Sequence, residues 1–332
     1  MSDVRTTVAT LLLLATLPAL AAPPAPATAP VEEARCDLRV ATGPRGKVYE
    51  KLFADMRQVC GNEVALCAVP SEGGLQNLTL LSSNQADIGL AQLDTWETLK
   101  DGDDNVRQLQ LVMPLHGNLL HVISLRSGSR VGVTTVMGRP VPGTGRVVEV
   151  RRYEDLTGLQ VAAVGSAQLM GQTVARQLGL SFQVLNAESE EQALEMLNSG
   201  KVQAVFTTVG WPSPFVGRLR DDSYTLVRFE GRAPPPYQLV KRNYQNLGAL
   251  NHPFLAAPNL LLSPPYRVSG NYFKRVASLQ RCLVKNLDAL QEGGFHPGWK
   301  EVRDPRQTFG LQPFPGAAAQ TAAAPENPSR SR

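Results

Sequence analysis

The chain has 332 residues, of which 43% are hydrophobic and 19% charged, and its formal net charge is +4. This small charge argues against a dedicated nucleic-acid binder, and the four cysteines match no zinc-ligand spacing, so we expect neither a nucleic-acid partner nor a metal or other cofactor. The length allows two domains or one large one.

The first 21 residues have the pattern of a secretory signal peptide. Arg5 supplies the basic start, an apolar run reaches Leu20, and Ala19-Leu20-Ala21 is a small-residue cleavage site. The run is shorter than the roughly 20 residues that a spanning helix needs, although an uncleaved anchor is an alternative. An Ala/Pro-rich linker is expected over residues 22–35, and the protein is expected in the periplasm.

The cysteines and the C-terminal end give two further expectations. An even number of cysteines in an exported chain indicates disulfides. Cys36, Cys60, Cys67 and Cys282 allow three pairings, among which Cys60–Cys67 is the first guess because it closes a short helix-to-strand loop. Residues 313–332 are Ala, Pro, Ser and Arg without periodicity, so we expect a disordered tail.

Strands and helices alternate from Cys36 onward. Short apolar strands are predicted at 38–41, 64–69 and 88–91, and helices at 48–59 and 75–81. This alternation requires a parallel sheet with right-handed crossovers. Two longer strands, 109–114 and 119–125, follow.

A second α/β unit repeats the pattern. The helix-to-strand phrase of 80–90 recurs in outline at 196–206, which indicates two lobes built alike. We expect lobe 1 over 36–125 with a return segment at about 250–312, and lobe 2 over 126–249. Further elements are predicted: a β-hairpin insertion at 130–153, strands at 159–165, 182–185, 204–208 and 259–262, a helix to 178, a helix capped by Ser189 and Gln192, and a long helix at 271–290.

Five loops follow predicted strands: 42–46, 71–74, 92–94, 166–173 and 210–213. In open α/β sheets, ligands bind outside the carboxyl ends of the strands, so these loops should converge. Three of them lead into helices, whose free N–H groups and partial positive charge suit a carboxylate or phosphate.

Four segments resemble the TAXI-type solute receptors of tripartite ATP-independent periplasmic (TRAP) transporters: 41–49, 71–78, 85–94 and the Gly-aromatic-Pro loop 210–214. The resemblance implies a type II periplasmic-binding-protein fold, in which two α/β lobes with a central cleft and hinge close over a ligand. Members are associated with small carboxylates such as amino acids.

The resemblance also implies which residues bind the ligand. Lobe 1 would contribute Thr42, Gly43, Tyr49, Ser71, Gly73, Gly74, Asn77, Gln92 and Asp94. Lobe 2 would contribute Ser166, Gln168, Gly171, Thr173 and Trp211, the last as a flat apolar face. The chain departs from the family at Gln168-Leu169-Met170, at Arg45 and Lys47, and in the hairpin, which leaves the identity of the ligand open.

These features predict a monomeric solute-binding protein that captures a small carboxylate-bearing ligand, an amino acid or organic acid, and delivers it to the permease subunits of a TRAP transporter. An orphan sensor that presents its closed form to a signalling receptor is the alternative. An enzyme is disfavoured, because no G-x-S-x-G, H-E-x-x-H or P-loop motif occurs, although Ser71, His116 and Asp94 could be drawn as a triad.

Two charged groups in the sequence are read as solvated surface or as partner docking sites. The acidic group consists of Asp94, Glu97, Asp101, Asp103 and Asp104. The basic group consists of Arg130, Arg139, Arg146, Arg151 and Arg152.

Overall fold

The structure is a computed structural model that describes residues 35–137 and 139–316. The predicted signal peptide, the predicted linker apart from Arg35, and the predicted tail from residue 317 lie outside the described residues.

The first half of the described chain folds as expected into a parallel βαβαβ unit. Its elements are β1 (Leu38–Gly43), α1 (Val48–Cys60), β2 (Leu66–Pro70), α2 (Gly74–Ser82), β3 (Ile88–Gln92), α3 (Leu93–Leu99) and α4 (Asp104–Arg107). β1 pairs in parallel with both β2 and β3. Its residues are almost all buried because helices cover both faces of such a sheet.

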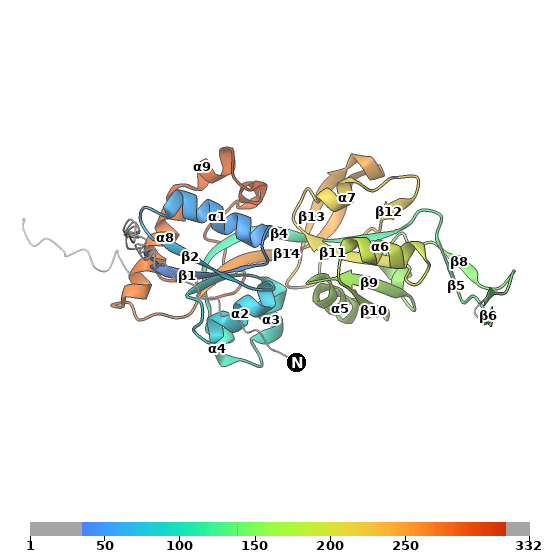
Figure 1. The fold of residues 1–332 in the computed structure, drawn as a ribbon, viewed down its shortest axis with the longest axis horizontal. Helices are drawn as coiled ribbons and strands as arrows, with labels where there is room; N and C mark the ends of the chain where they lie inside the picture. The colour runs from blue at the N-terminus through green and yellow to red at the C-terminus, as the bar shows by residue number, and fades with distance from the viewer. Residues whose placement is uncertain (1–34, 138, 317–332) are drawn as a thin grey trace, which may run out of the picture. The chain divides into compact units, whose positions relative to one another are not determined.

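Two long strands connect this unit to the next one (Figure 1). β4 (Gln110–Leu125) joins the two strands predicted at 109–114 and 119–125 into one, and β14 (Ala249–Ser263) extends the strand predicted at 259–262. The two run antiparallel to each other over most of their length.

The second unit repeats the α/β pattern. Its elements are β9 (Gln160–Val164), α5 (Ala167–Leu178), β10 (Gln183–Ala187), α6 (Glu190–Asn198), β11 (Ala204–Val209), α7 (Pro214–Gly217), β12 (Tyr224–Leu226) and β13 (Gln238–Tyr244), with short 3-10 turns η1 (Tyr153–Leu156) and η2 (Gln245–Leu247). β9 pairs in parallel with β10 and β11, and β11 pairs antiparallel with β4.

The strand order across both units is β10-β9-β11-β4-β14-β3-β1-β2. Two parallel α/β units, joined by a pair of antiparallel strands that pass through both, define the type II periplasmic-binding-protein fold. We call the unit around β1 to β3 lobe 1 and the unit around β9 to β11 lobe 2.

The cores of the two lobes meet within β4. Leu115 packs in the core of lobe 1, whereas Leu119 packs in the core of lobe 2. The change falls at Gly117 and Asn118, so residues 119–125 lie in lobe 2 rather than in lobe 1, where the sequence placed them. The boundary falls inside β4 because this one continuous strand contributes side chains first to the core of lobe 1 and then to the core of lobe 2.

The C-terminal segment returns to lobe 1 as α8 (Asn271–Lys285), α9 (Leu287–Glu292) and η3 (Pro297–Glu301). The single helix predicted at 271–290 is wrong. Asn286 leaves helical geometry, with φ −102° and ψ 15°, and its side-chain Nδ2 donates to the carbonyl of Cys282 at 2.9 Å. The backbone N–H of Asn286 also donates to this carbonyl, at 3.0 Å, so the helical hydrogen bond is kept and the change lies in the backbone angles of Asn286.

The disulfides and the chain end also differ from expectation. The pairs are Cys36–Cys67 and Cys60–Cys282, so the guess of Cys60–Cys67 is wrong. Phe314 is 3% exposed, packs 4.9 Å from the ring of Phe273, and its N–H donates to the carbonyl of Leu111 at 2.8 Å. The tail predicted from 313 therefore begins with a packed segment.

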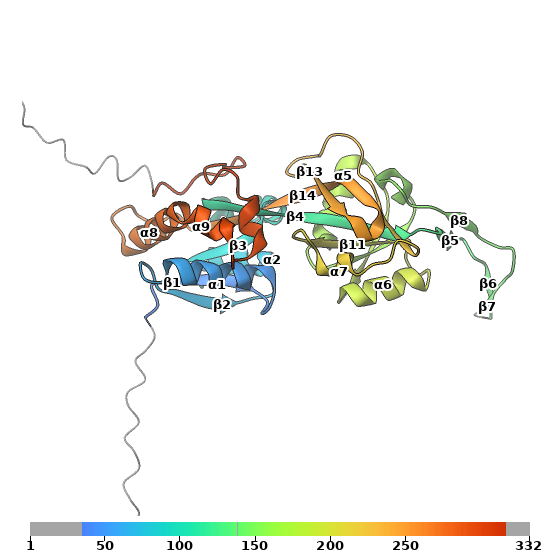
Figure 2. The ribbon, with the colours of Figure 1, turned by 90° about the horizontal axis from the view of Figure 1, so that it is seen from above.

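A β-hairpin leaves lobe 2 in the region where an insertion was expected. β5 (Ser129–Val131) pairs with β8 (Arg146–Val148), and β6 (Thr135–Val136) pairs with β7 (Arg139–Pro140). In Figure 1 and Figure 2 these strands extend away from the sheet of lobe 2.

Candidate functional site

A cleft of about 1040 Å³ lies at the carboxyl ends of the parallel strands and is lined from both lobes. Lobe 1 contributes the residues that follow β1 and β2, and lobe 2 contributes those that follow β9 and β11. Gln92 at the end of β3 also lines the cleft. All five strand-end loops that were expected to converge therefore contribute residues to the lining. A cleft of this size matches the usual range for small-molecule sites, roughly 300–1,000 Å³.

Three helices begin at the cleft without a side-chain cap. Lys47, Gly73 and Ser166 are the N-cap residues of α1, α2 and α5, and none of their side chains hydrogen-bonds to the first turn. All three residues line the cleft. By contrast, Ser189 and Ser213 cap α6 and α7. The first turns of α1, α2 and α5 thus present N–H groups and partial positive charge to an anion.

The floor of the cleft is a buried polar cluster on β4 and β14. Asn118 donates from Nδ2 to Gln92 Oε1 at 3.3 Å and to Asn259 Oδ1 at 3.4 Å. Asn259 donates in turn to the carbonyl of His116 at 2.9 Å and accepts a hydrogen bond from the Tyr49 hydroxyl at 2.6 Å. This network fixes the orientation of each amide.

Two atoms of this floor are left without a partner among the described residues. They are His116 Nδ1 and Asn118 Oδ1, on side chains whose residues are 2% and 8% exposed. Burial, assisted by the neighbouring His296, lowers the pKa of His116 to about 4 against the opposing effect of the nearby Asn118 side chain, so the imidazole is neutral at pH 7. Because a buried polar atom without a hydrogen bond costs about 1–3 kcal/mol, these two atoms favour a polar group bound in the cleft.

Charged side chains of both signs line the cleft, and several already have partners. Glu190 accepts a hydrogen bond from the Thr207 hydroxyl at 2.7 Å. Arg218 pairs with Glu191 at 3.4 Å. Glu301 pairs with Arg242 at 3.1 Å. The remaining charged residues of the lining are Lys47, Lys51 and Glu72.

Trp211 gives the lobe 2 side of the cleft a flat apolar wall. Its indole Nε1 donates to the carbonyl of Asn243 at 3.4 Å, and the guanidinium of Arg242 lies 5.4 Å from the ring centroid. These contacts hold the ring in place while leaving it half-buried in the lining.

Half of the residues expected to bind the ligand line the cleft. They are Tyr49, Gly73, Gly74, Gln92, Ser166, Gln168 and Trp211. The others lie outside the lining: Thr42, Gly43, Ser71, Asn77, Asp94, Gly171 and Thr173.

Ser71 and Asn77 hold α2 in place. The Ser71 hydroxyl donates to Asn77 Oδ1, and Asn77 Nδ2 donates to the carbonyl of Leu90 at 2.6 Å. Thr42 is 1% exposed at the end of β1, and Gly43, with φ +73°, makes the turn toward Tyr49. These residues shape the loops instead of lining the cleft.

Asp94 is 2% exposed, so it belongs neither to the lining nor to the acidic surface group. It accepts hydrogen bonds from the Thr95 N–H at 2.8 Å and from the Tyr237 hydroxyl of lobe 2 at 3.2 Å. Burial raises its pKa to about 6, against the opposing effect of these hydrogen bonds. Asp94 therefore joins the two lobes, and Thr173 interacts with the same tyrosine, where it opposes the burial that raises the pKa of Tyr237.

Gly171 is a packing residue. A Cβ at this position would lie 2.7 Å from Cδ2 of Phe206, so Gly171 is required by the packing of lobe 2.

The triad considered in the sequence analysis is not assembled, because each of its three side chains has another partner. Ser71 bonds to Asn77, Asp94 bonds to Tyr237 and Thr95, and His116 contacts Asn259. Within 35–137 and 139–316, no three His, Cys, Asp or Glu side chains group closely enough to hold a metal ion.

The lining residues His116, Asn118 and His296 were not among those predicted to bind the ligand, although His116 was considered for a triad. His116 and Asn118 fall between the strands predicted at 109–114 and 119–125, and they line the cleft because both segments form one strand, β4. His296 has no local signal in the sequence, since it reaches the cleft only when the C-terminal segment folds back on lobe 1.

No model of a known protein family matches the sequence, and no curated protein matches it. Solved structures do resemble the fold. The amino acid ABC transporter substrate-binding protein AbpA from Streptococcus pneumoniae, bound to L-arginine, is 12% identical with a TM-score of 0.45, over 80% of this chain and 92% of that one. The periplasmic VFT2 domain of BvgS from Bordetella pertussis is 14% identical with a TM-score of 0.41, over 76% and 82%.

A third similar structure is an arginine transport periplasmic binding protein from Legionella pneumophila. It is 11% identical with a TM-score of 0.44, over 81% of this chain and 100% of that one. No helix in the described part of the chain is both long and apolar enough to cross a bilayer.

Proposed function

We propose that this chain is a periplasmic solute-binding protein that traps a small carboxylate-bearing ligand between its lobes without altering it chemically. The observation that carries the proposal is the pairing of uncapped helix N-termini on the walls of the cleft with two unpartnered buried polar atoms on its floor. The walls suit an anion. The floor suits a second polar group of the same ligand.

The mixed charge of the lining supports an amino acid over a simple organic acid. Lys47 and Lys51 favour the carboxylate, whereas Glu72 and the acceptor Asn118 Oδ1 favour a donor such as an ammonium or hydroxyl group. Trp211 provides an apolar face for the carbon skeleton.

Delivery to the permease subunits of a TRAP transporter extends the proposal, and it is supported by the four sequence segments that resemble TAXI receptors. In the alternative function as a sensor, the same cleft binds the ligand, but the closed form binds a signalling receptor instead of a permease.

The test is a melting-temperature screen of the full chain against the proteinogenic amino acids and small dicarboxylates. A ligand present at 100 times its dissociation constant should add about 2.7 kcal/mol of stability. Chemical turnover of any member of this panel would restore the enzyme hypothesis.

Trp211→Ala should weaken binding of the stabilising ligand by up to about tenfold, because an aromatic contact contributes about 0.5–1.5 kcal/mol beyond the apolar area that it buries. Calorimetric titration measures this change. Tyr272→Ala is the matched control, since Tyr272 is an aromatic residue 44% exposed outside the cleft lining. Equal affinity of the two variants would remove Trp211 from the site.

A further inference from the structure

The hairpin between Ser129 and Val148 has an unusual composition. It contains three arginines and no aspartate or glutamate, together with six valines and one methionine. The segment is thus both cationic and apolar. We call residues 129–148 the arginine hairpin.

The apolar side chains of the arginine hairpin are open to solvent. Met137 is 99% exposed at the turn between β6 and β7, and Val136 and Val147 are 58% and 56% exposed. Figure 1 and Figure 2 both place β6 far from the sheet of lobe 2. Burying these side chains would be favourable, but no part of the described chain covers them.

The arginines of the hairpin are also available. Among the described residues, no ion pair includes Arg130, Arg139 or Arg146. Arg130 makes one hydrogen bond of 3.3 Å to the carbonyl of Thr144, on the hairpin itself. Their positive charge is therefore not neutralised by ion pairs within the described chain.

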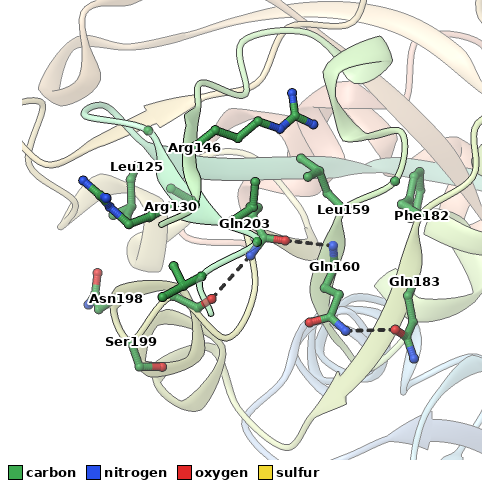
Figure 3. Close-up of a pocket in the computed structure, with 18 of the residues that line it drawn as sticks. Leu125, Arg130, Arg146, Leu159, Gln160, Phe182, Gln183, Asn198, Ser199 and Gln203 are labelled. Atoms are coloured by element: carbon green, nitrogen blue, oxygen red, sulfur yellow. Dashed lines mark hydrogen bonds between the residues drawn. The ribbon is translucent and has the colours of Figure 1, made fainter. Parts of the chain in front are cut away.

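A hollow of about 1660 Å³ at the base of the hairpin is lined by residues of the stem and of lobe 2 (Figure 3). Arg130 and Arg146 are the only charged residues of its lining, and they extend in different directions in Figure 3. The apolar part of its lining consists of Leu125, Val131, Val133, Leu159 and Phe182. Val131 and Val148 of the stem pack against the lobe 2 core, whereas Val136 and Met137 further along the hairpin are exposed. The distal part of the hairpin can therefore contact a surface without disturbing the packing of its stem.

We propose that the arginine hairpin binds the surface of a membrane that contains anionic phospholipids. Met137 and Val136 enter the headgroup region, and the three arginines bind the lipid phosphates. Apolar side chains combined with cationic ones are the composition that adsorbs to such surfaces. The contact would keep the protein near the membrane while leaving the cleft, formed by the opposite ends of the lobe 2 strands, open to solute.

A protein partner fits these observations less well. A stable protein interface buries about 800 Å² on each partner around a packed apolar centre. The arginine hairpin presents instead a narrow tip with a few separate apolar side chains, which suits shallow insertion into a lipid surface.

The experiment measures co-sedimentation of the full chain with two kinds of vesicle, phosphatidylcholine alone and equal parts of phosphatidylcholine and phosphatidylglycerol. The chain should bind the anionic vesicles more tightly, and added salt should weaken the binding. The triple variant R130Q/R139Q/R146Q should bind at least about tenfold more weakly, because each arginine near an anionic surface contributes about fivefold. Met137→Asp should also weaken binding.

The matched control is R267Q/R281Q/R306Q, which removes the same charge from exposed arginines of the C-terminal segment. All variants keep the same N-terminal segment, so differences among them report the hairpin. Equal losses in the two triple variants would mean that net charge alone drives binding and would overturn the proposal. Absence of binding to anionic vesicles, or full binding by both hairpin variants, would do the same. Ligand-induced melting shifts should be unchanged in every variant, so this test stands apart from that of solute binding.

Discussion

At the scale of single residues, Gly171 is needed for packing in lobe 2 and does not line the cleft. A methyl group on it would overlap Phe206 in the lobe 2 core, so Gly171→Ala should lower the free energy of unfolding by about 1–3 kcal/mol. Urea denaturation measures this change. Gly217→Ala is the control, because a Cβ there meets nothing within 4 Å. If G171A were as stable as G217A, the packing explanation would be wrong.

Buried histidines predict how stability depends on pH. Burial lowers the pKa of His116 to about 4, of His121 to about 3 and of His252 to about 4. An unfolded histidine titrates near 6.5, so the unfolded chain binds more protons than the folded chain in this range. The unfolding free energy should therefore fall between about pH 6.5 and pH 4, by roughly 2 kcal/mol per histidine from pH 7 to pH 5.

Asp94 acts in the opposite direction and supplies the control. As the pH falls, Asp94 is protonated near pH 6 in the folded state and only at lower pH in the unfolded state. Its contribution to stability is therefore greatest at low pH and is lost as the pH rises through 6. Asp94→Asn keeps an acceptor for Tyr237 and removes this titration. The variant should lose more stability on acidification than the unmodified chain, and a smaller loss would contradict the assignment.

At the scale of elements, the two disulfides should contribute unequally. Cys60–Cys282 ties α1 to α8 across a sequence separation of 222 residues, whereas Cys36–Cys67 spans 31. In the chain-entropy description, removing the first costs about 5 kcal/mol and the second about 4 kcal/mol. Cys60 and Cys282 are also buried in the lobe 1 core, which adds a packing loss. C60S/C282S should thus unfold at a lower urea concentration than C36S/C67S, and the reverse order would contradict this account.

The elements that the sequence predicted are those whose cause is local. The helices at 48–60 and 74–82 have an apolar stripe at helical spacing, and β1 and β3 are short apolar runs between turn residues. The elements that it missed have causes elsewhere in the chain. β14 is fifteen residues long because it pairs with β4, β3 and β13 in turn. The pairing of Cys60 with Cys282 likewise requires the return of α8 to lobe 1.

At the scale of the whole molecule, the site was predictable where it is made of strand-end loops. Gly73, Gly74 and Ser166 line the cleft because parallel strands end together. The floor could not be predicted in the same way, because His116 and Asn259 meet only when β4 and β14 pair. Gly171 was predicted to bind the ligand and does not line the cleft. A glycine is needed there because any side chain would overlap Phe206, which lies thirty-five positions further along the chain.

Two contacts outside the backbone join the lobes beside the long strands. Tyr237 donates to Asp94 at 3.2 Å, and Arg242 of β13 pairs with Glu301 of η3 at 3.1 Å. Together with β4 and β14 they define the region about which closure would occur. Closure of this kind reduces the radius of gyration and buries the ligand.

Small-angle X-ray scattering of the full chain, recorded with and without each amino acid and dicarboxylate of the panel, tests the central claim most directly. We predict that at least one of these solutes lowers the radius of gyration, raises the melting temperature and is recovered unchanged. Unaltered scattering with every solute, or chemical conversion of the solute that binds, would contradict the account.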